Sequence, residues 1–205
     1  MSKRTIHLII ALLAFLLGVA VTTTWYFKQP HTAPKLHLII LNASWEPSSF
    51  KLINSVVKLS AQTDLRKTNL PESDIEVRMW LGFGLSPLKG VTLKRVSGQW
   101  SAIRVKADNY YKPEKIEREE LGYPKSGWDV CWKRLVEADI LMLPDISEVN
   151  CGDGALDGAS IVIETNTNRI YRTYAYGVSM LEKCHETKQA MKVIFIIDEE
   201  FGWED

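Results

Sequence analysis

The chain has 205 residues, of which 46% are hydrophobic and 24% are charged, and 25 basic side chains balance 25 acidic ones. This composition is that of a globular protein and excludes a largely disordered one. Because proteins that bind nucleic acid usually carry a basic excess, no nucleic acid partner is expected.

The first predicted element is an apolar N-terminal segment. Lys3 and Arg4 precede residues 5–27, which contain no Asp, Glu, Lys or Arg and are long enough to cross a bilayer core. The aromatic pair Trp25 and Tyr26 suits the headgroup layer at the far end. We therefore predict one transmembrane helix, with a cytoplasmic N-terminus and an extracytoplasmic domain in a single-pass protein of the cell membrane.

A cleaved signal peptide is the alternative interpretation of this segment. The small residues at positions 18–20 have the spacing of a cleavage site, and cleavage would leave a periplasmic or secreted domain. Residues 29–35, which follow the apolar segment, contain two prolines within five positions, and this favours an extended spacer. The predicted organisation is an anchor or signal peptide at 1–28, a linker at 29–35 and a single domain at 36–205.

Elements with clear periodicity follow in the first half of the domain. Residues 36–41 form an apolar run typical of a buried strand, and Ser48 or Ser49 can cap a helix that ends at about Gln62. Further strands are predicted at 75–83, 91–96 and 99–106, the last two joined as a hairpin at Ser97-Gly98.

The second half is predicted to contain three helices and another hairpin. Residues 113–122 mix both charge signs, which favours a solvated helix with spaced ion pairs. A second helix is expected to begin at Ser126, and strands are expected at 159–165 and 169–176. Ser179 and Glu182 form a capping-box pattern before a last helix that ends near Gly202.

Hairpins dominate this order of elements, and long crossovers are few. The expected fold is therefore α+β: an antiparallel sheet of two hairpins plus extra strands, with helices packed on one face, preceded by one transmembrane helix.

Aromatic side chains on the predicted strands are weak candidates for a binding surface, although strand aromatics more often pack in a core. These candidates are Trp80, Trp100, Tyr171, Tyr174 and Tyr176. Glu76 and Arg78 share one strand face, and Glu164 and Arg172 are expected to face each other across the second hairpin.

The glycine-rich loop at 151–158 places Asp153 and Asp157 close together as weak binding candidates. Their spacing is not that of an EF-hand, and no bidentate Glu follows at the required distance. The four histidines show no zinc-binding spacing either. No metal and no other cofactor is therefore expected.

No catalytic residue is assigned. Cys184 and His185 are adjacent, and neighbouring residues on a helix point about 100° apart, so they are poorly placed as a nucleophile and its base. Three cysteines in an extracytoplasmic domain predict one disulfide and one spare thiol. Cys151 and Cys184 are the predicted pair, and Cys131 is expected to be buried as a small hydrophobe.

Four strings carry a resemblance to bacterial envelope proteins that have an N-terminal membrane segment and no assigned activity. They are Glu76-Val77-Arg78-Met79-Trp80, Leu143-Pro144-Asp145, Leu156-Asp157-Gly158-Ala159-Ser160-Ile161-Val162-Ile163-Glu164 and Tyr171-Arg172-Thr173-Tyr174-Ala175-Tyr176. The resemblance implies an envelope location.

The leading hypothesis is a membrane-tethered binding or interaction module of the bacterial envelope, held at the membrane by residues 5–27, with a protein partner as one option for its ligand. The alternative is a hydrolase-like envelope enzyme whose residues meet only in three dimensions, and Asp153, Asp157 and Glu164 are then its first suspects. A deep pocket of convergent polar groups favours the enzyme, and a shallow sheet face rimmed by aromatics favours binding.

Overall fold

The computed structural model describes residues 37–39, 45–83, 86–150, 160–178 and 184–203. All of them belong to the second of the chain's two compact units, Met1–Lys35 and Leu36–Asp205. The predicted membrane segment and linker lie outside these residues and stay predictions. Across the described ranges, no helix has both the length and the apolar character needed to span a bilayer.

The described residues form seven strands, three α-helices and two short 3-10 helices. In chain order these are β1 (His37–Ile39), α2 (Glu46–Leu59), η1 (Leu65–Lys67), β2 (Ile75–Gly82), β3 (Lys89–Val96), β4 (Gln99–Ala107), β5 (Ile116–Leu121), α3 (Trp128–Glu137), η2 (Ile146–Glu148), β6 (Ser160–Thr167), β7 (Ile170–Gly177) and α4 (His185–Phe201).

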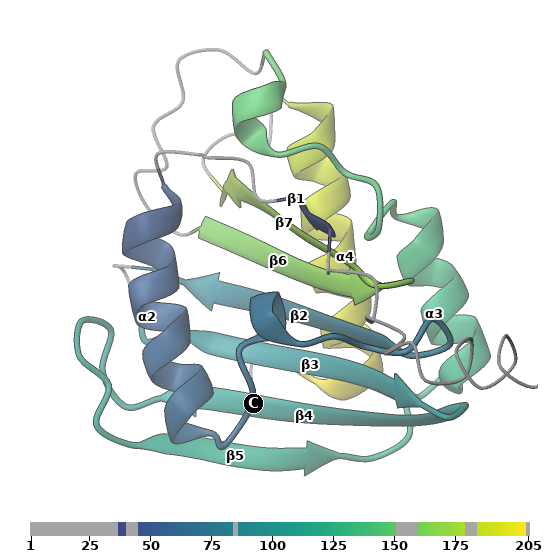
Figure 1. Ribbon diagram of the computed structural model, residues 1–205, viewed down its shortest axis with the longest axis horizontal. Coiled ribbons are helices and arrows are strands. Elements are labelled where there is room, and N and C mark those ends of the chain that lie inside the picture. The colour runs from purple at the N-terminus through teal and green to yellow at the C-terminus, as the bar shows by residue number, and fades with distance from the viewer. Residues whose placement is uncertain (1–36, 40–44, 84–85, 151–159, 179–183, 204–205) are drawn as a thin grey trace, which may run out of the picture. The chain divides into compact units, whose positions relative to one another are not determined.

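The strands form one sheet in the order β1-β7-β6-β2-β3-β4-β5. Six of them, from β7 to β5, pair antiparallel, and the short β1 adds to the β7 edge in parallel. The meander β2–β5 and the hairpin β6–β7 join where β2 pairs with β6 (Figure 1). The predicted α+β class with an antiparallel sheet is confirmed.

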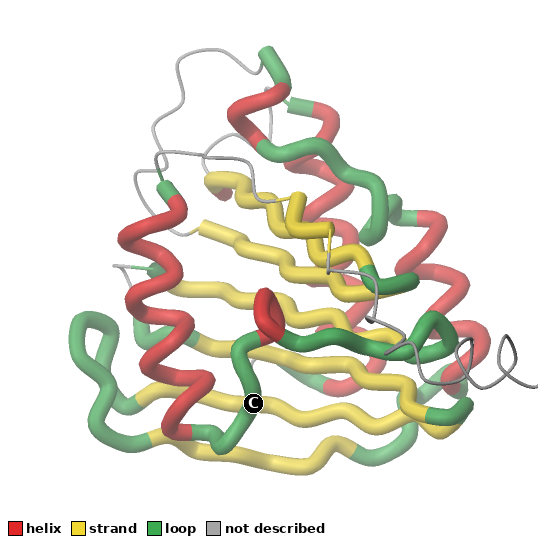
Figure 2. Tube along the Cα trace, viewed as in Figure 1, coloured by secondary structure: helices red, strands yellow, loops and turns green. Residues whose placement is uncertain are grey.

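Helices cover both faces of the sheet, so the expectation of helices on one face is wrong. α2 packs on one face, whereas α3 and α4 pack on the other (Figures 1 and 2). The central strands explain this arrangement. β6 buries apolar side chains on both faces, such as Val162 on the α2 side and Ile163 on the other, and each face needs its own cover.

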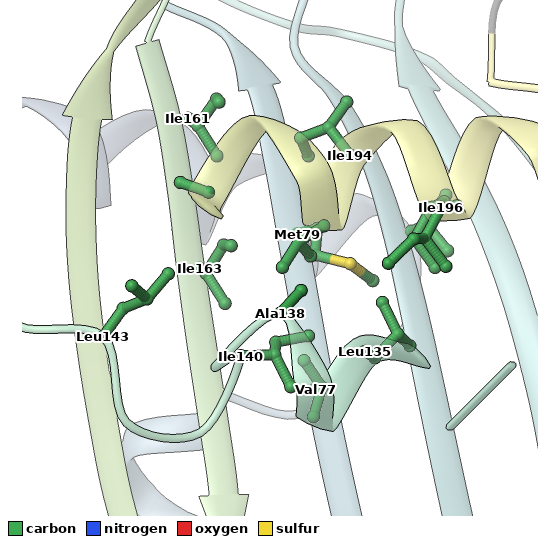
Figure 3. Close-up of a cluster of buried hydrophobic side chains, with 14 of the residues drawn as sticks. Val77, Met79, Leu135, Ala138, Ile140, Leu143, Ile161, Ile163, Ile194 and Ile196 are labelled. Atoms are coloured by element: carbon green, nitrogen blue, oxygen red, sulfur yellow. The ribbon is translucent and has the colours of Figure 1, made fainter. Parts of the chain in front are cut away.

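The larger core lies between the sheet and the pair α3 and α4. Val77 and Ile163 on the strands meet Leu135 of α3 and Ile196 of α4, as Figure 3 shows. Cys131 is fully buried in the same cluster, as predicted for this residue.

The smaller core lies under α2. Its helix contributes Phe50, Ile53 and Val56, which pack against Trp80 and Val162 of the sheet. These three helix positions are spaced by three, so they lie on one face of α2. The apolar contacts fill one part of this sheet face and leave polar side chains beside them.

The charged segment predicted as a helix at 113–122 is instead the edge strand β5. Its backbone pairs with β4 from Ala102↔Leu121 to Ala107↔Ile116, and Arg104 forms a 2.6 Å ion pair with Glu119. Helix propensity is a weak preference that a free sheet edge can override. Charged side chains on the outermost strand also hinder pairing with other chains.

Helix starts differ from the capping predictions. α2 begins at Glu46, ahead of Ser48, with a proline in its first turn. α3 begins after Gly127, because the Ser126 hydroxyl donates to Glu200 at 2.7 Å and does not cap the helix. The Ser179 capping box lies outside the described residues, whereas the predicted end of the last helix at Gly202 is confirmed.

Candidate functional site

The α2 side of the sheet carries a row of polar side chains because of strand alternation. Glu76, Arg78 and Trp80 point to this face of β2, and Arg78 lies opposite Glu164 of β6 in the register. Glu76 lies opposite Lys94 of β3. The pattern that predicted a half-buried strand thus brings four charged residues together at the middle of the sheet.

Glu164 is buried and fully enclosed by donors. The Trp80 indole N–H donates to one carboxylate oxygen at 2.7 Å, and the Tyr171 hydroxyl donates to the other at 2.9 Å. Burial raises the pKa of Glu164, and the Arg78 charge and these two hydrogen bonds oppose that rise. Burial, followed by the nearby Glu164 charge, raises the pKa of Tyr171 well above its ordinary value.

Arg78 is only 1% exposed and is held from two directions. Its Nε donates to Glu76 Oε1 at 2.9 Å, and its Nη2 donates to the backbone carbonyl of Thr63 at 2.8 Å. Its Nη1 has no hydrogen-bond partner in the described part of the chain, and neither does Nε2 of the nearby Gln62. Buried donors without partners are uncommon, and both atoms keep a donor that a ligand or a water reaching them could use.

A polar pocket of about 260 Å³ opens beside this arginine, between the residues that follow α2 and the strands β2–β5. Its lining residues are mainly charged or hydroxylated: Ala61, Gln62, Thr63, Glu76, Arg78, Thr92, Lys94, Ser101, Ile103 and Arg118. We call this site the polar pocket.

The polar pocket carries an excess of positive charge. Arg78, Lys94 and Arg118 line it together with one carboxylate, that of Glu76, whose Oε2 lies 3.0 Å from Lys94 Nζ. Glu120 neutralises part of the excess at the rim, 3.5 Å from Arg118. The end of α2 adds a partial negative charge of about half a unit. Among the side chains that line the pocket, three are cationic and one is anionic, a balance that suits an anionic ligand.

The five predicted aromatic residues do not form one surface. Trp80 and Tyr171 belong to the buried network on the α2 face. Tyr174 and Tyr176 lie on the opposite face, where their hydroxyls donate to the carbonyls of Ile140 and Pro144. Trp100 is half-buried. Its ring stacks on Trp128 with the centroids 5.4 Å apart and lies tilted against Trp132 with the centroids 5.1 Å apart.

The expected contact between Glu164 and Arg172 is wrong. Glu164 pairs in register with Thr173, and Arg172 pairs with Thr165, so the two side chains point to opposite faces. The turn is the two residues Asn168-Arg169, whereas the predicted strands leave a turn of three residues, 166–168. This change from an odd to an even number of turn residues exchanges the faces of the second strand.

The lining residues on β3–β5 were missed as site residues. The sequence pattern places Thr92, Lys94 and Ser101 in a hairpin without indicating a role, and it places Arg118 in a helix. A signal was present, because polar residues at positions 92, 94 and 101 alternate with apolar ones and would share a sheet face. Which strand pairs with the segment around Arg118 could not be read from this alternation.

Asp145 forms a second buried polar centre, which joins α2, η2 and β7. Its carboxylate accepts from the Trp45 indole at 3.2 Å, from the Ala175 backbone N–H at 2.9 Å and from the Ser147 hydroxyl at 2.6 Å. Burial and this neighbouring carboxylate raise the pKa of Glu46 to about 7. Because all its close partners are donors from the fold itself, Asp145 acts as a structural anchor.

Two predicted features reach into parts of the chain that are not described. Asp153 and Asp157 lie outside the described residues, so their candidacy as binding residues and the expectation of no metal both stay predictions. Cys151 also lies outside them, and the Cys151–Cys184 bridge stays a prediction. Cys184 itself is described and is 2% exposed.

No protein-family model matches the chain, and no curated protein matches its sequence. The function must therefore be argued from the site itself.

Proposed function

We propose that this chain is a membrane-tethered binding module of the bacterial envelope, and that the polar pocket binds a small anionic ligand. The observation that carries the proposal is the buried Arg78, whose Nη1 has no partner among the described residues in a pocket that also contains Lys94 and Arg118. A guanidinium that is fixed before binding loses little entropy when a carboxylate or phosphate arrives.

Binding fits this pocket better than catalysis. The Thr92 hydroxyl donates to Gln62 at 3.1 Å, and Lys94 is paired with Glu76. Among the described lining residues, no hydrogen bond joins a hydroxyl to a base, which is the geometry that an activated nucleophile requires. Glu164, one of the first suspects for an enzyme, is enclosed by the Trp80 and Tyr171 donors and is 1% exposed.

The membrane part of the proposal rests on the uncharged apolar residues 5–27 and on the aromatic pair Trp25 and Tyr26 near the end of that segment. Cell fractionation with N-terminal sequencing tests it. The expected result is a membrane-bound product that retains residues 5–27. A soluble product that begins at Val21 would show that the segment is a cleaved signal peptide.

Isothermal titration of the full chain in detergent tests the ligand class, with phosphate, sulfate, acetate and citrate as probes. At least one anion is expected to bind, and Lys94→Gln is expected to weaken that binding about tenfold, because it removes one of the three positive charges that line the pocket. Lys106→Gln is the matched control, because Lys106 lies on the opposite face of β4 and is exposed.

Two results would overturn the proposal: none of the four anions binds, or Lys94→Gln and Lys106→Gln bind them equally well. Conversion of an added ester or amide by the wild-type chain but not by Lys94→Gln would instead identify the pocket as catalytic.

A further inference from the structure

A second cavity, of about 410 Å³, lies between α2 and the connection from β4 to β5. Its described lining residues are aromatic, hydroxylated or basic, with one leucine: Trp45, Ser48, Ser49, Lys51, Leu52, Ser55, Phe83, Tyr110, Tyr111, Lys112 and Ser160. We call it the tyrosine groove. It shares no lining residue with the polar pocket.

One wall of the groove is a strip along α2. Ser48, Lys51, Leu52 and Ser55 are three or four positions apart, so they lie on the same side of the helix. The hydroxyls of Ser48 and Ser55 donate to backbone carbonyls, each at 3.0 Å. Their oxygens keep lone pairs that can accept hydrogen bonds from a ligand.

The other wall is an ordered loop that is longer than the hairpin requires. Eight residues, 108–115, separate β4 from β5, whereas a hairpin connection commonly has about two to five. Asn109 Oδ1 accepts from the backbone N–H of Tyr111 at 2.8 Å, and Asp108 Oδ1 accepts from that of Glu114 at 3.1 Å. The loop is thus fixed by its own polar side chains.

This loop carries two tyrosines that the core does not need. Tyr111 is 77% exposed and Tyr110 is 36% exposed, and their ring centroids lie 4.1 Å apart. Core packing therefore gives little reason for two large rings at this position. Exposed aromatic side chains on an ordered loop beside a cavity are typical of a recognition surface.

We propose that the tyrosine groove is a binding site for an acidic saccharide, a sugar that carries carboxylate, sulfate or phosphate groups. A sugar ring presents an apolar C–H face that can lie on Tyr111, and its hydroxyls can exchange hydrogen bonds with Ser48 and Ser55. Lys51 and Lys112 are the only charged side chains among the described lining residues, and both are cationic. They select for negative substituents.

Isothermal titration of the full chain tests this site, in a detergent whose headgroup is not a sugar. The probes are trigalacturonate, a sulfated heparin tetrasaccharide and glucose 6-phosphate, with the neutral maltotriose for comparison. At least one acidic probe is expected to bind more tightly than maltotriose. Tyr111→Ala is expected to weaken it about tenfold, because the stacking platform is lost.

Matched variants outside the groove show whether a loss of binding is specific to the groove or follows from any loss of an exposed tyrosine or lysine. Tyr123→Ala removes a tyrosine that is 84% exposed elsewhere, and Lys58→Gln removes an exposed α2 lysine outside the groove. Both should bind like wild type, whereas Lys112→Gln should weaken the acidic probe and leave maltotriose unchanged.

Three results would overturn the proposal: none of the acidic probes binds, maltotriose binds equally well, or Tyr111→Ala has no effect. Because Lys94→Gln changes only the polar pocket, loss of binding in that variant alone would reassign the anion to that pocket.

Discussion

Glu46 lies in the first turn of α2 and is the partly buried carboxylate with a pKa raised to about 7. Burial is the main cause, and the charge of Asp145 adds to it. In the unfolded chain the ordinary value of 4.5 applies. Between about pH 4.5 and pH 7 the Glu46 carboxyl therefore stays protonated in the folded state, whereas it is ionised in the unfolded chain. Its contribution to the free energy of unfolding is present in full below this pH range and declines as the pH rises through it.

We predict that the melting temperature falls between pH 5 and pH 8, and that Glu46→Gln flattens this fall. In the wild-type protein, the free energy of unfolding is expected to fall by about 1–2 kcal/mol over this pH interval. This is less than the pKa shift alone implies, because solvent screens a partly exposed side chain. Melting curves at several pH values measure it. Glu114→Gln, at an exposed position, should keep the wild-type slope, and a Glu46→Gln slope equal to wild type would contradict the prediction.

Glu164 supports the α2 face of the sheet by accepting two hydrogen bonds from buried donors. Glu164→Ala is predicted to destabilise the protein by about 3 kcal/mol or more, because the Trp80 N–H and the Tyr171 O–H would both lose their acceptor and Arg78 would lose a neighbouring charge. Glu164→Gln keeps one acceptor oxygen and should cost less. Urea unfolding measures both, and an equal, small loss in both variants would show that water replaces the carboxylate.

The sequence predicted the residues of this network but not their burial. Alternation in β2 showed that Glu76 and Arg78 share a face, and it suggested a solvent-exposed ion pair. Alternation reports which side chains point the same way, and it does not report what covers them. Here η1 and the end of α2 supply the cover, and Asn166 binds the backbone of Leu65 at 3.2 Å across 101 residues.

At the scale of elements, β2 and β3 fit together through a large and a small residue. Trp80 lies opposite Gly90, and a Cβ atom placed on Gly90 would lie 2.4 Å from the Trp80 ring. We predict that Gly90→Ala destabilises the protein by about 1–3 kcal/mol, because the buried Trp80 ring must move and its hydrogen bond to Glu164 is then strained. Urea unfolding followed by tryptophan fluorescence gives both the stability and the change around Trp80.

Gly122→Ala is the control for this variant, since a Cβ at Gly122 would meet no atom within 4 Å. It should be neutral or slightly stabilising. A Gly90→Ala protein as stable as Gly122→Ala would mean that the Trp80 ring can shift without cost.

The strand β5 shows why some elements could not be predicted from the local sequence. Its charges at 117–120 suit a helix surface and an edge strand equally well, and the choice depends on the free edge of β4. The hairpin β3–β4 was predicted correctly because its turn and its alternation are both local. Arg118, whose side chain reaches the polar pocket only through the β4–β5 pairing, was missed for the same reason.

At the scale of the domain, the sheet joins segments that are distant in the chain. β2 pairs with β6 over eight positions, from Ile75↔Thr167 to Gly82↔Ser160, and this pairing puts Arg78 beside Glu164. The class α+β followed from the hairpins, but the strand order and the second helical layer depend on these long-range pairings. The polar pocket needs both, because the residues that follow α2 supply its rim and four strands supply its floor.

The last prediction concerns the bridge Cys151–Cys184, which would link the segment before the β6–β7 hairpin to the start of α4. It would close a loop of about 34 residues, and chain entropy gives such a loop roughly 3–4 kcal/mol. This is a large share of a typical stability of about 5–15 kcal/mol. Since β6 lies inside the sheet between β7 and β2, the bridge would hold the hairpin that contributes side chains to both cores.

Cys131 should stay outside this chemistry. It is buried between α3 and the sheet, and burial, with a smaller contribution from Glu200, raises the pKa of its thiol to about 11, which keeps it in the unreactive protonated form. Protein from an oxidising compartment, alkylated in guanidinium without a reductant, should label Cys131 alone and give one linked peptide pair. Labels on Cys151 and Cys184 would refute the bridge, and a cross-link to Cys131 would refute the pairing. Guanidinium is needed because Cys131 and Cys184 are both buried. In native protein neither would be labelled, so the reaction could not distinguish a bridge at Cys184 from burial of this side chain.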